Sequence, residues 1–202
     1  MKIIELILDE EGTMAVDAIS AVSAPAIESN FIYLSKDGKP TKGRKVELAE
    51  VSKEKRLLMG AALIPNKLIL RRDETTGEKF YIFFSQKTVR DAMEIFLKKG
   101  NQSNITEEHE KKVEGVTVVE SWLKEDMTHD KSAKYGLNDP VGTWMVTMKA
   151  ENGEIYEKAK SGELNGFSIE AQFADRFQYE QIKADEADLI SKIMDILSEE
   201  DE

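Results

Sequence analysis

Short apolar runs separated by turn residues cover most of the chain, and they predict a protein built mainly of β-strands. The runs are rich in Val, Ile, Leu and aromatic residues and are too short for typical helices. The predicted strands are residues 3–8, 57–64, 68–71, 79–84, 115–123, 143–149 and 166–173. Residues 15–32 are expected to form strand and loop, because Pro25 removes a backbone donor and restricts the residue before it.

Two helices are predicted between these strands. Ser85 is a suitable N-cap for a helix over residues 86–99, which has one apolar side, and Gly100 is a suitable stop. A shorter helix is expected over residues 154–160, before Ser161-Gly162. Helices and strands together predict an α+β fold.

The C-terminal end differs from the rest of the chain. From Lys183 to Glu202 eight acidic and two basic residues give a net charge of −6. Apolar residues between Leu189 and Leu197 recur at intervals of three and four, as on one side of a helix. We therefore predict a main domain over residues 1–180 and an acidic amphipathic helix or tail over 181–202. Docking on the core, binding of a partner and removal as a tail all stay open as its role.

Composition limits the classes of function. The net charge of −11 argues against an extended nucleic-acid-binding surface, which needs clustered Lys and Arg. The absence of Cys excludes disulfides, thiolate nucleophiles and sulfur-based zinc sites. No apolar run reaches the roughly 20 residues that cross a bilayer. We expect a soluble intracellular protein with no membrane or nucleic-acid partner and no cofactor. The Gly38 to Gly43 spacing is not read as a phosphate loop, because Arg44-Lys45 follows it.

Strand parity gives the first candidate for chemistry. In residues 166–170 successive side chains alternate between the two faces, so Phe167 and Ile169 point one way and Ser168 and Glu170 the other. With the apolar pair in the core, a hydroxyl and a carboxylate stand about 7 Å apart on the opposite face. A half-exposed strand with outward polar residues is the alternative interpretation.

A nucleophilic Ser needs a neighbouring base that accepts its proton near neutral pH. The chain has two His residues, His109 and His129. His109 precedes a predicted strand, whereas His129 lies in the polar stretch 124–140, so His109 is the favoured base. Both residues are also compatible with solvated surface positions.

Metal binding is a competing use of the same region. Residues 107–110 offer three Glu and one His, and Asp126, His129 and Asp130 form a second acidic group. Neither group has the spacing of H-E-x-x-H or another fixed ligand pattern. We therefore predict no metal site, and a small metal-dependent hydrolase is the weaker reading.

Four segments in order carry a family resemblance: His109, then Val118-Val119-Glu120-Ser121-Trp122, then Gly142–Val146, then Gly166–Glu170. This succession resembles the prohead (capsid maturation) serine proteases of tailed phages, which are similar in fold to herpesvirus assemblins. The resemblance runs from about Leu57 to Phe173. The first fifty residues also look like the opening of such phage proteins, and whether they belong to the same barrel stays open.

The resemblance implies a mainly antiparallel β-barrel flanked by helices, with nucleophile and base on neighbouring strands. Ser168 matches the nucleophile and His109 the base. Assemblins use a second His after the nucleophile, but none follows Ser168 here. Glu170 is therefore expected as the third member, with Glu120 as the alternative. No paired Arg follows Ser168 either, which leaves the oxyanion donors open.

The implied activity is that of a serine endopeptidase, a hydrolase acting through an acyl-enzyme. The substrates that the resemblance implies are the phage scaffold, the major capsid protein and the protease itself. The implied location is the assembling prohead in the bacterial host cytoplasm, and a second copy of the protease is one candidate partner. The alternative function is a non-enzymatic capsid-assembly or scaffold-associated protein with the same fold.

Overall fold

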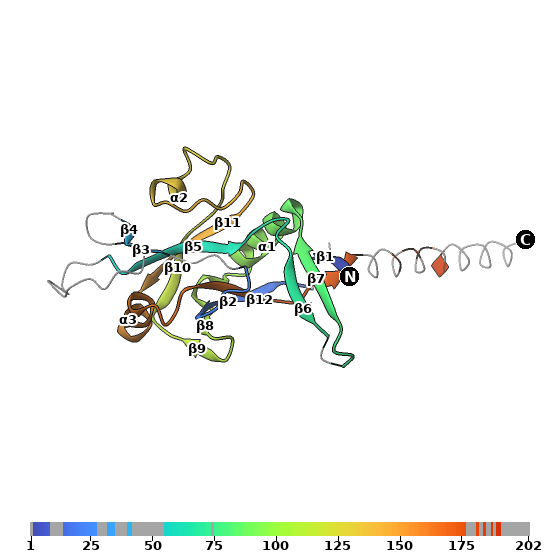
Figure 1. The fold of residues 1–202 in the computed structure, drawn as a ribbon, viewed down its shortest axis with the longest axis horizontal. Helices are drawn as coiled ribbons and strands as arrows, with labels where there is room; N and C mark the ends of the chain where they lie inside the picture. Colours follow the sequence, from blue (N-terminus) through green and yellow to red (C-terminus); the bar gives the residue numbers. More distant parts are fainter. Residues whose placement is uncertain are drawn as a thin grey trace, which may run out of the picture.

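The structure is a computed structural model of the chain (Figure 1). It describes residues 2–8, 14–27, 32–34, 40–41, 55–73 and 75–176, together with 181, 184, 187, 189 and 190. For residues 32–34 and 40–41 it describes the backbone. Of the basic loop that contains Gly38 and Gly43, all but residues 40–41 lies outside the described residues.

Strands dominate the described chain, and they pair into three sheets. The first sheet has the order β13-β1-β7-β6, with strands β13 (Ala174–Asp175), β1 (Ile3–Ile7), β7 (Lys79–Phe84) and β6 (Ile69–Arg72). The second has the order β10-β11-β5-β3-β4, with strands β10 (Val116–Leu123), β11 (Trp144–Ala150), β5 (Leu57–Leu63), β3 (Ile32–Leu34) and β4 (Pro40–Thr41). The third has the order β12-β2-β8-β9, with strands β12 (Gly166–Ala171), β2 (Val16–Val22), β8 (Ile105–Glu107) and β9 (Lys111–Val113).

The few helices lie between strands. They are α1 (Gln86–Lys98), the 3-10 turn η1 (Asn101–Ser103), α2 (Lys131–Lys134) and α3 (Gly153–Ser161). This content agrees with the predicted α+β class. The described pairings form three separate sheets and close no barrel, and two of them, β1 with β7 and β2 with β8, are parallel. The barrel and the assemblin-like fold therefore stay predictions.

The core lies where the sheets and α1 meet. Helix α1 begins at the predicted cap, because the Ser85 side chain accepts a hydrogen bond from Thr88 N. Its buried side includes Val89 and Phe96, and the Phe96 ring lies 5.4 Å from that of Trp144 on β11. These contacts bury the apolar side of α1 against the central strands, which removes apolar surface from water.

The main strands and the two longer helices lie close to the predicted ranges, whereas the shortest elements were not predicted. Residues 124–140 were expected to be a polar loop, but they contain α2, which Asp130 caps by accepting from Ser132 N over 2.8 Å. The strand expected over 166–173 ends at Ala171 and is followed by β13. Strands β8 and β9 have three residues each, which is too short for a periodic pattern to be recognised.

Little of the predicted terminal helix is described. Residues 181, 184, 187, 189 and 190 are helical, and Leu189 and Ile190 are 58% and 61% exposed. The boundary at residue 180 stays a prediction. In the described part of the chain, no helix combines the length and the apolar character needed to cross a membrane.

Candidate active site

Strand β12 presents an apolar face and a polar face. Phe167 is fully buried and Ile169 packs against the core, whereas Ser168 and Glu170 are half-buried. Alternate residues of a strand share a face, so the hydroxyl and the carboxylate project together on the side away from Phe167. The predicted parity of this strand is confirmed.

A row of hydroxyls crosses the polar face of this sheet. Ser168 is paired with Ser20 on β2, and Ser20 is paired with Thr106 on β8. Residues paired across neighbouring strands point to the same face. Ser20 is fully buried, whereas Ser168, on the edge strand, is half-buried. Of the two serines, Ser168 is thus the one that a substrate could reach.

His109 lies in the tight turn that joins β8 to β9. Glu110 N donates to Glu107 O over 3.0 Å, and the two central residues, Glu108 and His109, have φ values of 51° and 62°. Two left-handed central residues form a type I′ turn, for which Asn and Gly are the usual residues. Each non-glycine residue in this conformation costs about 1 kcal/mol. Such backbone strain clusters at functional sites, which makes this turn a candidate.

The resemblance placed the nucleophile and the base on neighbouring strands, and this expectation is wrong in its detail. Strand β2 lies between β12, which carries Ser168, and β8, which leads into the His109 turn. The pairing of β8 with β2 continues into the turn, where Glu108 N donates to Ala21 O over 3.1 Å, and His109 N then reaches the Ser20 side chain on the face of β2. His109 is therefore brought to the polar face by a turn that folds over β2 rather than by direct strand pairing.

Three further contacts hold this turn in place. Glu107 accepts a hydrogen bond from Lys158 on α3 over 2.7 Å, and Glu108 accepts one from Ser23 N over 2.7 Å. His109 N donates to the buried Ser20 Oγ over 2.9 Å. The hydrogen bond to Glu107, followed by that to Glu154, raises the pKa of Lys158 above its ordinary value. The turn is thus fixed to α3 and to β2.

Glu170 and His109 are in direct contact. His109 Nδ1 lies 3.3 Å from Glu170 Oε1, and their side chains are 42% and 32% exposed. Thr106 Oγ1 donates a short hydrogen bond to the same carboxylate oxygen. A carboxylate on Nδ1 is the contact that orients the imidazole in serine hydrolases, leaving Nε2 for the nucleophile.

Ser168 completes the set on the same face. It lies two residues from Glu170, and in the described chain its Oγ makes no hydrogen bond to His109. Catalytic hydrogen bonds are often long or poorly aligned before substrate binds, so the absence of this hydrogen bond does not exclude a nucleophile and base pair. The backbone brings a half-buried alcohol, an imidazole and a carboxylate to one face of one sheet.

The other candidates of the sequence lie elsewhere. His129 Nδ1 is 3.3 Å from Asp126 Oδ1 in an exposed turn, and Asp130 caps α2 and accepts from Trp122 Nε1. Glu120, the alternative third member, is on β10 and accepts a short hydrogen bond from Lys131. Among the described residues, the carboxylate in contact with His109 is that of Glu170.

The environment of Glu120 accounts for its charge without a catalytic role. Partial burial acts to raise the pKa of Glu120, but the hydrogen bond and the charge of Lys131 act in the opposite direction, and the pKa is lowered overall. Glu107 and Glu108 are likewise hydrogen-bonded within the protein, to Lys158 and to Ser23 N. Within the described ranges, no group of three or more His, Asp or Glu side chains is arranged to hold a metal ion.

Sequence reasoning missed Ser20 and Thr106, which position His109 and Glu170. A polar residue in the otherwise apolar run Ala18–Val22 was the available signal for Ser20. Its partner could not be identified without the strand pairing.

An alcohol, an imidazole and a carboxylate on one face are the side chains that serine hydrolases use. A comparison with known families agrees. The family described as "Putative phage serine protease XkdF" matches residues 45–178. This match covers more than half of the chain, which therefore belongs to this family of phage serine proteases. The predicted resemblance to phage serine proteases is confirmed at that level.

Two other comparisons gave no further relative. Neither the search of curated proteins nor the search of solved structures found a match.

Proposed function

We propose that this protein is the serine endopeptidase of phage head maturation, with Ser168 as nucleophile, His109 as base and Glu170 as the orienting carboxylate. One observation carries the assignment: the contact of His109 Nδ1 with Glu170, on the strand face that also bears Ser168. Membership of a phage serine protease family supports the reaction class.

The proposed reaction is hydrolysis of a peptide bond in two stages. Ser168 Oγ attacks the scissile carbonyl carbon while His109 Nε2 takes the hydroxyl proton, and the Oγ–C bond forms. The C–N bond then breaks as His109 returns the proton to the leaving amine. In the second stage His109 deprotonates a water molecule, which attacks the acyl-enzyme and releases the acid and free Ser168.

Glu170 acts through His109 in this scheme. Its carboxylate accepts the Nδ1 proton, selects the tautomer that leaves Nε2 free, and stabilises the imidazolium that forms. The hydrogen bond from Thr106 fixes one oxygen of Glu170. Backbone N–H groups are the proposed donors to the oxyanion.

The proposed substrates are the phage scaffold, the major capsid protein and the protease itself. The proposed setting is the assembling prohead in the cytoplasm of the bacterial host. The test is co-expression of scaffold and capsid protein with the wild type, with Ser168→Ala or with the exposed-serine control Ser161→Ala. Cleavage should occur with the wild type and with Ser161→Ala and stop with Ser168→Ala. Equal cleavage with Ser168→Ala would remove Ser168 from the mechanism.

A second candidate is a non-enzymatic capsid-assembly or scaffold-associated protein. It is favoured by the lack of a hydrogen bond between Ser168 Oγ and His109 in the described structure. A fluorophosphonate probe separates the two functions, because it reacts with activated serines. Labelling of Ser168 that disappears in His109→Ala supports the protease, and the absence of labelling in the wild type supports the assembly protein.

A further inference from the structure

The sheet β13-β1-β7-β6 exposes apolar side chains on one of its faces. Ile3 on β1 is paired with Tyr81 on β7, and Tyr81 is paired with Leu70 on β6, so the three side chains form one row across the sheet. Ile3 and Leu70 are 56% and 48% exposed, and Tyr81 is half-buried. Phe83, two residues after Tyr81, lies on the same face and is also half-buried. These four residues form what we call the outer face of the sheet.

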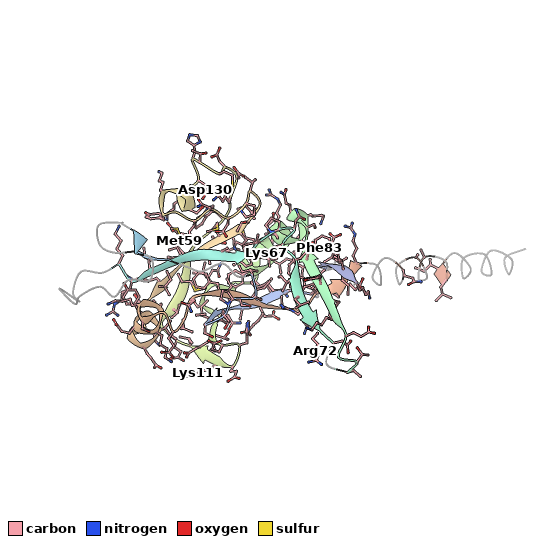
Figure 2. The ribbon with its side chains drawn as sticks, viewed as in Figure 1. Met59, Lys67, Arg72, Phe83, Lys111 and Asp130 are labelled. Atoms are coloured by element: carbon pink, nitrogen blue, oxygen red, sulfur yellow. The ribbon has the colours of Figure 1, made fainter. Side chains whose placement is uncertain are left out.

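The opposite face of the same sheet is packed against the core. Ile69, Ile82 and Phe84 alternate with the residues of the outer face and are buried. Figure 2 labels Phe83 on β7 and Arg72 on β6, the two strands of the hairpin at this end of the molecule. A sheet with one buried face usually has polar side chains on the other, whereas the outer face here is apolar. Exposed apolar patches of this kind mark interaction surfaces.

The C-terminal residues carry a second exposed apolar surface. Leu189 and Ile190 are helical and are 58% and 61% exposed. In the sequence, Ile193, Met194 and Leu197 continue the spacing of three and four residues that places apolar side chains on one side of a helix. Such a helix is stabilised mainly by burying its apolar side against another element. The single chain therefore leaves two apolar surfaces exposed, one on a sheet and one on a helix.

The two surfaces carry opposite charges. Strands β6 and β7 contain three basic residues and no acidic one: Arg71, Arg72 and Lys79. Arg72 and Lys79 are paired with each other and lie on the outer face, next to the row that contains Leu70 and Tyr81. On β1, Glu5 is paired with Arg176 over 2.9 Å. Residues 183–202, in contrast, contain eight acidic and two basic residues. An acidic helix on this face would therefore meet basic side chains beside the apolar row.

We propose that the outer face binds the acidic C-terminal helix of a second copy of the chain, and that the second copy binds the helix of the first in the same way. This exchange has twofold symmetry and closes a dimer. Leu189 and Ile190 lose their contact with water against Ile3 and Leu70, and the acidic side of the helix faces the basic end of the hairpin. A second copy is the occupant because the helix of the single chain leaves Leu189, Ile190 and its own outer face uncovered. The dimer does not require Ser168 to be a nucleophile.

The first test is sedimentation velocity of the full chain over a range of concentrations. The wild type should show a monomer–dimer equilibrium. Leu70→Asp and Ile190→Asp should each raise the dimer Kd about tenfold or more, because each substitution places a charge twice in the apolar contact. Val119→Asp is the matched control, since Val119 is 51% exposed on β10, and it should leave Kd unchanged. A monomer at every concentration, or equal effects of Leu70→Asp and Val119→Asp, would overturn the proposed dimer.

The second test identifies the contacting surfaces by a disulfide, because the natural chain contains no Cys. Leu70→Cys chains are mixed with size-tagged Ile190→Cys chains and oxidised, and the mixed disulfide should exceed both symmetric disulfides. Replacing Leu70→Cys by Val119→Cys in the mixture should remove this excess. Equal yields with Leu70→Cys and Val119→Cys would contradict the assigned surfaces. In the double variant Leu70→Cys/Ile190→Cys, a disulfide within one chain would show that the helix covers its own sheet, and would overturn the exchange between copies.

Discussion

Each of the two histidines of this chain contacts a carboxylate, but the surroundings of the two pairs differ. In both, Nδ1 lies 3.3 Å from a carboxylate oxygen, Glu170 for His109 and Asp126 for His129. The His129 side chain is 85% exposed, against 42% for His109. The distance alone therefore does not identify a functional imidazole.

The origin of the carboxylate separates the two pairs. Asp126 is three residues before His129 and accepts from the backbone N–H groups of Thr128 and His129 over 2.6 Å, so the pair is a property of one local turn. Glu170 comes from a different strand, and its position depends on β2, β8 and β12 together. The His109 pair is held by tertiary structure and by a strained turn, as expected of a site that must keep one geometry.

Removing each imidazole should give the largest difference in activity between the two histidine pairs. His109→Ala should lower kcat/KM for peptide hydrolysis by about 10⁴- to 10⁶-fold, because Ser168 loses its base. His129→Ala should leave kcat/KM unchanged. The measurement is steady-state hydrolysis of a capsid-derived substrate by both variants. A loss with His129→Ala equal to that with His109→Ala would contradict the assignment of the base.

Neutralising each carboxylate should have the next largest effect. Glu170→Gln keeps the size of the side chain but removes its negative charge. Because the His109 imidazolium then loses its stabilising carboxylate, kcat should fall about 10²- to 10⁴-fold. Asp126→Asn is the matched change at the other pair and should have no effect on kcat. If Glu170→Gln retains full activity while Glu120→Gln does not, Glu120 is the third member instead.

Backbone strain predicts that the Gly and Ala variants rank in opposite orders of stability at the two histidines. His109→Gly should be more stable than His109→Ala by about 1 kcal/mol, because glycine adopts φ near 62° without steric cost. His129 does not have a positive φ, so His129→Ala should be at least as stable as His129→Gly. Urea unfolding of the four variants measures both differences. Equal stability of the two His109 variants would show that the turn carries no strain.

The smallest effect concerns pH at the His129 turn. Hydrogen bonds from the backbone of His129, and then of Thr128, lower the pKa of Asp126 below its ordinary value. A lowered folded pKa contributes stability above the unfolded pKa, and this contribution is lost as the pH falls through the folded value. The His129 and Thr128 amide signals should thus titrate below the ordinary range of an Asp in an NMR experiment. Asp126→Asn should abolish that titration.

The sequence was informative where a pattern is local. The parity of Gly166–Glu170 follows from the period of two of a strand, and the start of α1 follows from the capping ability of Ser85. Both could be predicted from the residues alone. The preference for Ser168 came from the same strand parity, and that for His109 from its place before a predicted strand. The family came from the order of four separated segments.

The remainder of the site depends on pairing that no local pattern specifies. The contact of His109 with Glu170 requires β8 and β12 on either side of β2, and β8 is only three residues long. The roles of Ser20 and Thr106 follow from the register of these strands, which tertiary packing sets. The closed barrel was expected from the resemblance, and the described pairings do not contain the contacts that would close it.

The most direct measurement is the distance between Ser168 Oγ and His109 Nε2 in a crystal structure of the protein in complex with a non-covalent peptide inhibitor. The account predicts a hydrogen bond of about 2.6 to 3.2 Å, with Nδ1 still on Glu170. An imidazole turned away from Ser168 while the inhibitor occupies the site would contradict it.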